Sequence, residues 1–184
     1  MAHNNFLSAY DYLPKEDDVF LVDTNVLISL FTPINGRDEM IGRQYEKFIR
    51  KADAKSKFVV TSMNLSELIN VNLRYEYDRY RANGNDIKYK EYRKLQEFEK
   101  ELELLKSVIE RQLLKMMERI NDDFTNIDVV NCFSGQTDCF DFADRYYVEL
   151  ARKNCMKILT NDYDFSVISD VYIVSTNPKF FGHT

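Results

Sequence analysis

The sequence alternates between short runs of apolar, mostly β-branched or aromatic residues and longer stretches with helical periodicity. Strands that alternate with helices form a parallel sheet with helices on both faces. The predicted strands are Val19–Val22, Phe58–Val60, Ile127–Val130, Met156–Leu159 and Val171–Val174. The predicted helices are Asn25–Phe31, Glu39–Lys51, Asn64–Arg81, Tyr89–Ile120, Asp138–Lys153 and Phe165–Ile168. We therefore expect one α/β domain over residues 1–184, with about five parallel strands.

One stretch departs from this alternation. Between Tyr89 and Ile120, apolar residues recur every three or four positions, which is typical of an amphipathic helix. No Gly or Pro interrupts the stretch, and Asn83-Gly84-Asn85 precedes it as a break. We expect a long helical insertion at approximately residues 83–125.

The residue types narrow the chemistry that this chain could perform. The only histidines, His3 and His183, lie at the ends of the chain, where order is least expected. We therefore expect neither an imidazole base nor a His-ligated zinc, so acid–base and metal chemistry would come from carboxylates. The cysteines, Cys132, Cys139 and Cys155, lack metal-site spacing and favour a reduced, cytoplasmic protein.

Charge and hydropathy also limit the partners. No apolar run approaches the roughly 20 residues of a membrane helix, and residues 1–18 lack the basic and apolar regions of a secretory signal. The net charge of −5 argues against a uniformly basic nucleic-acid binder but leaves a local basic face open. We expect no contact with a membrane.

Three acidic residues follow predicted strands. Asp23 ends the first strand, Glu67 lies in the first turn of the helix after the second, and Asp162 follows the fourth. The carboxyl ends of parallel strands are where open α/β sheets place their ligands. Each residue also has a local interpretation: Asp23 as a helix cap, Glu67 as the partner of Asn64 in a capping box, and Asp162 as part of a turn in which Asp164 caps the next helix.

A fourth acidic residue lies where a helix should be apolar. At about 100° per residue, Asp144 falls within the apolar sector of the helix predicted from Asp138, Asp141 lies at the edge of that sector, and Asp138 points away. A carboxylate that faces a core needs a partner, because unpaired buried charge is unfavourable. That partner is either a Lys or Arg in a salt bridge, or a bound cation.

These positions converge on one crevice of a doubly wound sheet. Two carboxylates about 5 Å apart repel by about 3 kcal/mol at an effective dielectric constant near 20. Several carboxylates in one crevice therefore call for cations, and oxygen ligands suit Mg²⁺ or Mn²⁺.

Taken together, the motifs resemble those of PIN-domain ribonucleases. The resemblance rests on Asp23-Thr24-Asn25 after the first strand, on Glu67, and on Asp144 eighteen residues before Asp162 in Leu159-Thr160-Asn161-Asp162. It covers Val19 to Thr176 apart from the helical insertion, in which the chain departs from the compact bacterial toxins of the family. A toxin role and an RNA-processing role both stay open.

The resemblance implies a Mg²⁺- or Mn²⁺-dependent endoribonuclease that cleaves single-stranded RNA. The implied metal ligands and catalytic residues are Asp23, Glu67, Asp144 and Asp162, with Asp141 as an auxiliary catalytic residue. Asn25 and Thr160 would support them. RNA, single-stranded or structured, is the expected partner, and a protein inhibitor or a homodimer stays open.

Two other functions stay open. A phosphatase or phospho-accepting receiver also places an Asp after its first strand, but Asp-Thr-Asn lacks the second Asp of a phosphatase motif, and the only lysine near the last strand is Lys179. A catalytically silent scaffold that binds protein or RNA is the other alternative, although all four acidic positions are filled.

Basic and tyrosine residues interleave before and within the predicted insertion. The basic residues include Arg79, Arg81, Arg93 and Lys94. Cationic side chains neutralise phosphates and tyrosine rings stack on unpaired bases, so this stretch is a candidate RNA-binding surface. The alternative is a solvated helical surface with half-buried tyrosines.

Overall fold

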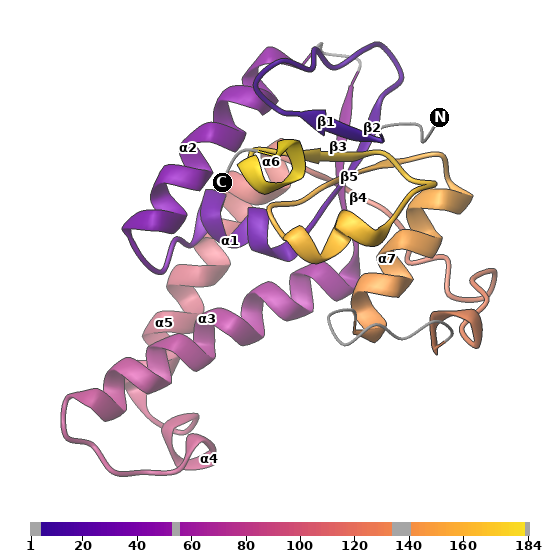
Figure 1. Cartoon of the computed structure of the whole chain (residues 1–184). Helices are drawn as coiled ribbons and strands as arrows, with labels where there is room; N and C mark the ends of the chain where they lie inside the picture. The colour runs from indigo at the N-terminus through magenta and orange to yellow at the C-terminus, as the bar shows by residue number, and fades with distance from the viewer. Residues whose placement is uncertain (1–4, 53–55, 134–140, 183–184) are drawn as a thin grey trace.

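A computed structural model of the chain describes residues 5–52, 56–133 and 141–182. The described residues form one all-parallel sheet of six strands in the order β1-β6-β5-β2-β3-β4 (Figure 1). The strands are β1 (Phe6–Ser8), β2 (Val19–Val22), β3 (Lys57–Val60), β4 (Glu118–Arg119), β5 (Lys157–Leu159) and β6 (Ile173–Ser175). The predicted α/β class and parallel sheet are therefore confirmed, with one more strand than expected.

The helices include long and very short segments. The α-helices are α1 (Thr24–Phe31), α2 (Gly36–Lys51), α3 (Ser62–Ala82), α4 (Tyr89–Tyr92), α5 (Gln96–Val108), α6 (Leu114–Met116) and α7 (Phe142–Lys153). A π-helical turn, η1 (Ile109–Leu113), joins α5 to α6. Three 3₁₀ segments are η2 (Asn131–Phe133), η3 (Tyr163–Val167) and η4 (Pro178–Phe181). None of the described helices is long and apolar enough to cross a membrane.

Successive residues of the central strands face opposite sides of the sheet, as the strand geometry requires. Phe20 and Val22 of β2 pack in one apolar layer with α1 and α2, whereas Leu21 packs in a second layer with α7. The same division separates Ile158 from Leu159 in β5. The sheet thus has a helical layer on each face, and its central strands are buried on both sides.

A close approach between α1 and α2 depends on Gly42. A β-carbon at this position would lie 2.0 Å from the backbone oxygen of Ser29, so no larger residue fits without movement of the helices. This contact holds α1, which begins directly after Asp23, against the rest of its layer.

One predicted strand was wrong, and two strands at the edges of the sheet were not predicted. Ile127–Val130 forms turns, in which Ile127 N donates to Asp123 O and Val130 is 78% exposed. Within Ile127–Val130, Ile127 alone is buried, and it packs in the apolar layer that contains α7. The strand next to β3 is instead β4, whose residues are charged and exposed because β4 lies at the edge of the sheet. The other edge strand, β1, was not predicted.

The single helix predicted over Tyr89–Ile120 was also wrong. Its helical course stops after Tyr92, resumes at Gln96 and passes through the π turn before it ends at Met116. The break brings Tyr92, which is 2% exposed, against Tyr77 and Phe98. The gain in aromatic packing accounts for the interruption.

The outer part of α3 and the returning α5 form a helical arm, residues 73–108, that projects from the body of the molecule (Figure 1). The arm has its own apolar cluster, made by Leu73, Tyr77, Tyr92, Phe98 and Leu105. This cluster gives the arm a core separate from the two layers of the sheet.

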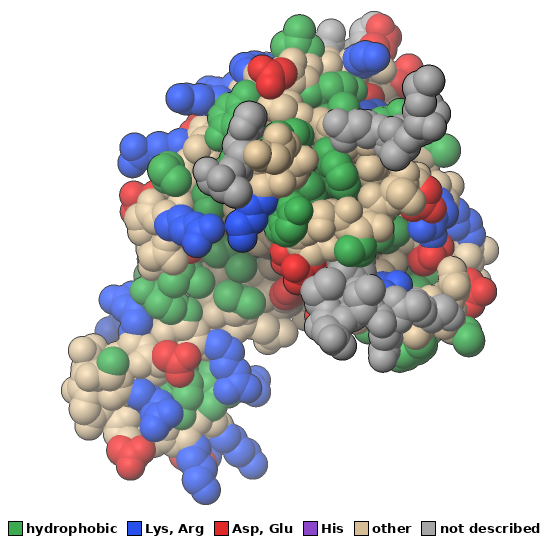
Figure 2. All heavy atoms as spheres, in the orientation of Figure 1, with side chains coloured by type: hydrophobic (Ala, Val, Ile, Leu, Met, Phe, Trp, Pro, Cys, Tyr) green, Lys and Arg blue, Asp and Glu red, His purple; other side chains and the backbone are tan. Residues whose placement is uncertain are grey.

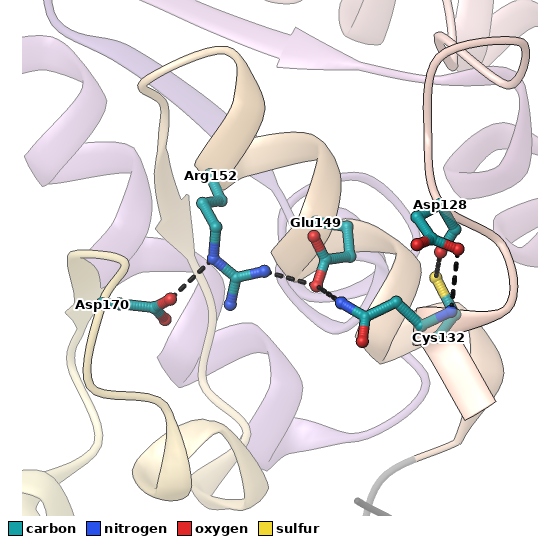
Figure 3. Close-up of polar contacts among 6 residues, drawn as sticks. Asp128, Cys132, Glu149, Arg152 and Asp170 are labelled. Carbon is teal, nitrogen blue, oxygen red and sulfur yellow. Dashed lines mark hydrogen bonds and ion pairs between the residues drawn. The ribbon is translucent and has the colours of Figure 1, made fainter. Parts of the chain in front are cut away.

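A polar network holds the carboxyl half of α7 (Figure 3). Arg152 Nε donates to Asp170 Oδ2 at 2.6 Å, and a second guanidinium N–H group donates to Glu149. Asn131 Nδ2 also donates to Glu149, and Asn131 N donates to Asp128. The network ties α7 to η2 on one side and to the loop before β6 on the other, so it helps to orient the helix that carries Asp144.

Candidate active site

The candidate site lies where the strand order reverses. From β2 the chain proceeds outward to β3 and β4, whereas β5 and β6 lie on the other side of β2. Such a switch point leaves a crevice beyond the carboxyl ends of the strands. Asp23 follows β2 and Asp162 comes three residues after the end of β5, while Glu67 and Asp144 come from α3 and α7.

Asp23 is a buried carboxylate that is 7% exposed. It occupies the N-cap position of α1, yet its side chain makes no capping hydrogen bond. Instead Asp23 Oδ2 accepts from Thr160 Oγ1 at 2.5 Å and from Asn25 Nδ2 at 2.6 Å. Burial raises the pKa of Asp23 to about 6, with a further increase from the charges of Glu67 and Asp162.

Thr160 and Asn25 connect the loops after β2 and β5. Thr160 Oγ1 donates to Asp23 and accepts from Asp162 N at 2.9 Å, while Asn25 Nδ2 contacts the same hydroxyl at 3.2 Å. Asn25 Oδ1 also accepts from Asn161 N. These contacts set Asp23 and the backbone of Asp162 in one hydrogen-bonded unit.

Glu67 does not cap α3. The N-cap of that helix is Thr61, and its reciprocal partner is Asn64. Glu67 Oε2 instead accepts a 2.7 Å hydrogen bond from Thr24 Oγ1, at the residue next to Asp23. Its exposed side chain therefore reaches across from α3 to the start of α1.

Asp144 lies in the first turn of α7, half-buried. Asp141 is the N-cap residue and accepts from Asp144 N, while Asp144 Oδ2 accepts from Asp141 N at 3.4 Å. Burial raises the pKa of Asp144 to about 7, and the charges of Asp141, Asp23 and Asp162 add to that increase. In the part of the chain that the structure describes, no Lys or Arg forms an ion pair with Asp144. Asp138 lies outside the described residues.

Asp162 has a structural contact of its own. It caps η3, because Asp162 Oδ1 accepts from Asp164 N at 2.9 Å, so the expected cap at Asp164 was wrong. Its exposed carboxylate nonetheless acts electrostatically on both Asp23 and Asp144. Asp162 can therefore cap η3 and still belong to the acidic crevice, by which we mean the region around the carboxylates of Asp23, Glu67, Asp144 and Asp162.

The carboxylates fit a divalent cation in chemical type. Asp23, Glu67, Asp144 and Asp162 offer only oxygen ligands, and none of them has an ion-pair partner among residues 5–52, 56–133 and 141–182. Within those same ranges, however, no three acidic, histidine or cysteine side chains are arranged so that they could hold a metal ion. The carboxylates act on one another electrostatically, which raises the pKa of Asp23 and of Asp144, but they are not gathered around a common point.

Two cavities flank the carboxylates. One, of about 440 Å³, is lined by Asn25, Asn161, Asp162 and the exposed Arg37 of α2, among others. The second, of about 590 Å³, is lined by Ser62, Met63, Ser66, Glu67, Asn70, Val71, Asp141, Ala143 and Tyr147. Figure 2 shows acidic side chains where the arm meets the part of the molecule that carries α7, with Lys and Arg side chains nearby.

Arg37 and Tyr147 were not among the residues selected from the sequence. Arg37 follows the Asn35 cap of α2 and carries no sequence signal that relates it to Asp162. Tyr147 has the helical spacing of a core residue, and its ring is indeed in the apolar layer. Only the tertiary structure, in which residues of α3 and α7 line one cavity, reveals where its hydroxyl lies.

The basic residues selected on the arm are exposed, but three of the four have acidic partners. Arg79 pairs with Glu76 at 2.9 Å, Lys94 with Glu91 at 3.0 Å, and Arg81 approaches Asp86 at 3.9 Å. Arg93 lies over the Phe98 ring. The neighbouring tyrosines are buried or half-buried, and Tyr77, Tyr80, Tyr89 and Tyr92 pack on one another.

A family model described as the PIN domain matches residues 20–171, which is most of the chain. The chain therefore belongs to the PIN-domain family, whose members are typically metal-dependent ribonucleases. A search of curated proteins gave no match.

Among solved structures, the chain is similar to a chain of VapBC2 from Rickettsia felis, crystallised with a DNA fragment from its promoter. The two are 13% identical, the match covers 84% of this chain and 96% of that chain, and the TM-score is 0.44. It is also similar to PAE2754 from Pyrobaculum aerophilum, with 14% identity, coverage of 92% and 97%, and a TM-score of 0.43.

Proposed function

We propose that this chain is an endoribonuclease that hydrolyses phosphodiester bonds of single-stranded RNA and depends on Mg²⁺ or Mn²⁺. The observation that carries the proposal is the pair Asp23 and Asp144. Asp23 is buried and Asp144 is half-buried, and the pKa of each is raised. Neighbouring carboxylates repel both side chains, and among the described residues no Lys or Arg forms an ion pair with either of them. Such an arrangement is unfavourable for folding and favourable for binding a cation.

Asp23, Glu67, Asp144 and Asp162 would hold the metal. A divalent ion bound there supplies a water of lowered pKa and neutralises the charge that develops on the phosphoryl group. The hydrogen bonds from Thr160 and Asn25 fix the orientation of the Asp23 carboxylate before any ligand binds. This preorganisation is the contribution that the chain itself makes to the site.

Hydrolysis also needs a proton acceptor. As the water oxygen forms a bond to phosphorus and the P–O bond of the leaving nucleotide breaks, one proton leaves the attacking water. Glu67 and Asp141 are the candidates to take it, because both line the 590 Å³ cavity and each uses one carboxylate oxygen in a known hydrogen bond.

The arm offers a second contact with RNA. Arg79, Arg81, Arg93 and Lys94 are exposed, and an ion pair on the surface contributes little, so an RNA phosphate would compete readily with Glu76 or Glu91. The tyrosines of the arm, by contrast, are engaged with one another. We therefore assign the arm a role through charge, without base stacking. A protein inhibitor and a homodimer stay predictions.

The experiment that tests the activity compares an unstructured RNA oligonucleotide with a hairpin of the same length, each with Mg²⁺, Mn²⁺ or EDTA. We expect cleavage of the unstructured RNA with either metal and none with EDTA. Cleavage that persists in EDTA, or that prefers the base-paired stem, would contradict the proposal.

A further inference from the structure

Tyr147 presents a buried hydroxyl group that the fold does not use. The residue is 3% exposed and its ring packs in the apolar layer beside α7. Its Oη is buried and has no hydrogen-bond partner among the described protein atoms. A phenylalanine would fill the same ring volume without burying an unsatisfied polar group, so the hydroxyl is a cost to the fold that packing does not explain.

The surroundings of this hydroxyl are those of the acidic crevice. Tyr147 lines the 590 Å³ cavity together with Glu67 and Asp141. Thr24 Oγ1, which is near enough to influence the phenol, donates its own hydrogen to Glu67 and does not reach hydrogen-bond geometry with Tyr147. The cavity also has Ser66 and Asn70 on its walls, so its neutral polar groups lie beside the carboxylates.

The protonation state of Tyr147 makes it a donor. Burial raises the pKa of the phenol, and the charges of Glu67, Asp23 and Asp144 act in the same direction. A tyrosine phenol is neutral near pH 7 in any case, so Tyr147 has a hydrogen to donate. A neutral O–H group without a partner, on a residue that lines a cavity with carboxylates, is suited to an anionic ligand that enters this cavity.

We propose that Tyr147 Oη donates a hydrogen bond to a non-bridging oxygen of the RNA phosphodiester in the crevice. This inference rests on the proposed ribonuclease function and adds a substrate-contacting residue to it. The hydroxyl stabilises the negative charge that grows on the phosphoryl oxygens during hydrolysis, and it does so without a positive charge that would compete with a cation for the carboxylates.

The chain contains a matched control at the preceding position. Tyr146 lies on the same helix and is equally buried, but its hydroxyl donates to Asp122 O at 2.7 Å. Tyr146→Phe therefore removes a hydroxyl that the fold uses, whereas Tyr147→Phe removes one that it does not. Tyr147→Phe should therefore lower activity without lowering stability, whereas Tyr146→Phe should lower stability with little change in activity.

Two measurements are made on both variants and on the unchanged protein. Thermal melting in EDTA should show Tyr147→Phe at or above the unchanged midpoint and Tyr146→Phe below it. Single-turnover cleavage of an unstructured RNA with Mn²⁺ should fall roughly 10- to 100-fold for Tyr147→Phe and stay within about twofold for Tyr146→Phe, which keeps the crevice intact. The rise in melting temperature with Mn²⁺ should be the same for Tyr147→Phe and the unchanged protein.

Several results would overturn the inference. Unchanged cleavage by Tyr147→Phe would do so while leaving the ribonuclease proposal standing. A melting midpoint as low as that of Tyr146→Phe would show that the hydroxyl has a partner within the fold. A lost response to Mn²⁺ would place the hydroxyl at the cation. If the unchanged protein did not cleave RNA, the proposed function and this inference would both fall, and melting alone would still report on the hydroxyl.

Discussion

Thr160 Oγ1 donates a 2.5 Å hydrogen bond to Asp23 Oδ2 and thereby joins the end of β5 to the end of β2. The same oxygen accepts from Asp162 N, so one hydroxyl group links two of the four carboxylate residues. Since Asp23 is buried, the geometry of this carboxylate is set by Thr160 and Asn25 and not by solvent.

Replacement of Thr160 by Val should therefore affect both stability and activity. The substitution keeps the side-chain shape but leaves Asp23 with one fewer donor and Asp162 N without its acceptor, which should cost about 1–2 kcal/mol of the free energy of unfolding. Urea denaturation measures this loss. Thr160→Ser, which retains the hydroxyl, should recover most of it; equal losses in the two variants would mean that the methyl group matters and the hydrogen bond does not.

Stability without metal should decrease as pH rises. Asp23 and Asp144 have folded-state pKa values of about 6 and about 7, above the ordinary value of 3.8. The folded state therefore binds more protons than the unfolded state between about pH 4 and pH 7, and it loses that stabilisation as these carboxyl groups ionise. For Asp23 the shift corresponds to roughly 3 kcal/mol, and the partly exposed Asp144 adds less than its own shift suggests.

The measurement is a series of denaturation curves in EDTA from pH 5 to pH 8. The unchanged protein should become less stable across this range, and Asp23→Asn should show a flatter profile. A stability that is constant or rises over the same range would mean that the carboxylates do not repel one another as described.

Divalent metal should reverse this penalty. A cation that binds only the folded protein raises the melting temperature by mass action. We therefore expect a few millimolar Mn²⁺ to raise the midpoint of thermal melting at pH 8. Asp144→Asn should melt higher than the unchanged protein in EDTA and respond less to Mn²⁺. Asp86→Asn serves as the control, because Asp86 is 99% exposed on the arm; an identical Mn²⁺ response in all three proteins would rule out a shared site.

Arg37 should contribute to RNA affinity as one cation that contacts a phosphate. It lines the cavity that contains Asp162 and forms no ion pair with any described residue. Arg37→Ala should weaken RNA binding roughly tenfold at low salt and reduce the slope of log affinity against log salt by about 1. Replacing Arg79, Arg81, Arg93 and Lys94 together with Ala tests the arm in the same titration; if only the arm variant lost affinity, the strand would follow the arm and bypass α2.

The sequence predicted the parts of this molecule that are determined by burial. β2, β3, β5 and β6 were located because central parallel strands are apolar on both faces, and Asp23, Glu67 and Asp162 because they follow such strands. The edge strands β1 and β4 were missed because they are short, and β4 is formed by Glu118 and Arg119. The break after Tyr92 follows from tertiary packing in the arm, which overrides a continuous helical periodicity.

The candidate site also combines features that the sequence predicts with features that only the tertiary packing shows. The charge of Asp144 in an apolar sector was visible in the sequence, because a carboxylate violates the pattern of its helix. The hydroxyl of Tyr147 was not visible, because a tyrosine satisfies that pattern with its ring, and only the tertiary arrangement shows that its oxygen is buried without a partner and within the electrostatic influence of the carboxylates. Arg37 likewise depends on how α2 packs beside the loop after β5.

The most direct test of a metal-dependent nuclease at this crevice is the cleavage rate of an unstructured RNA by Asp23→Asn, measured with Mn²⁺ beside Asp86→Asn. Asp23 is the buried centre of the site, and loss of its charge should reduce the rate by at least about 100-fold, or about 3 kcal/mol of transition-state stabilisation. Asp86→Asn should cleave at the unchanged rate. Full metal-dependent cleavage by Asp23→Asn would contradict the account.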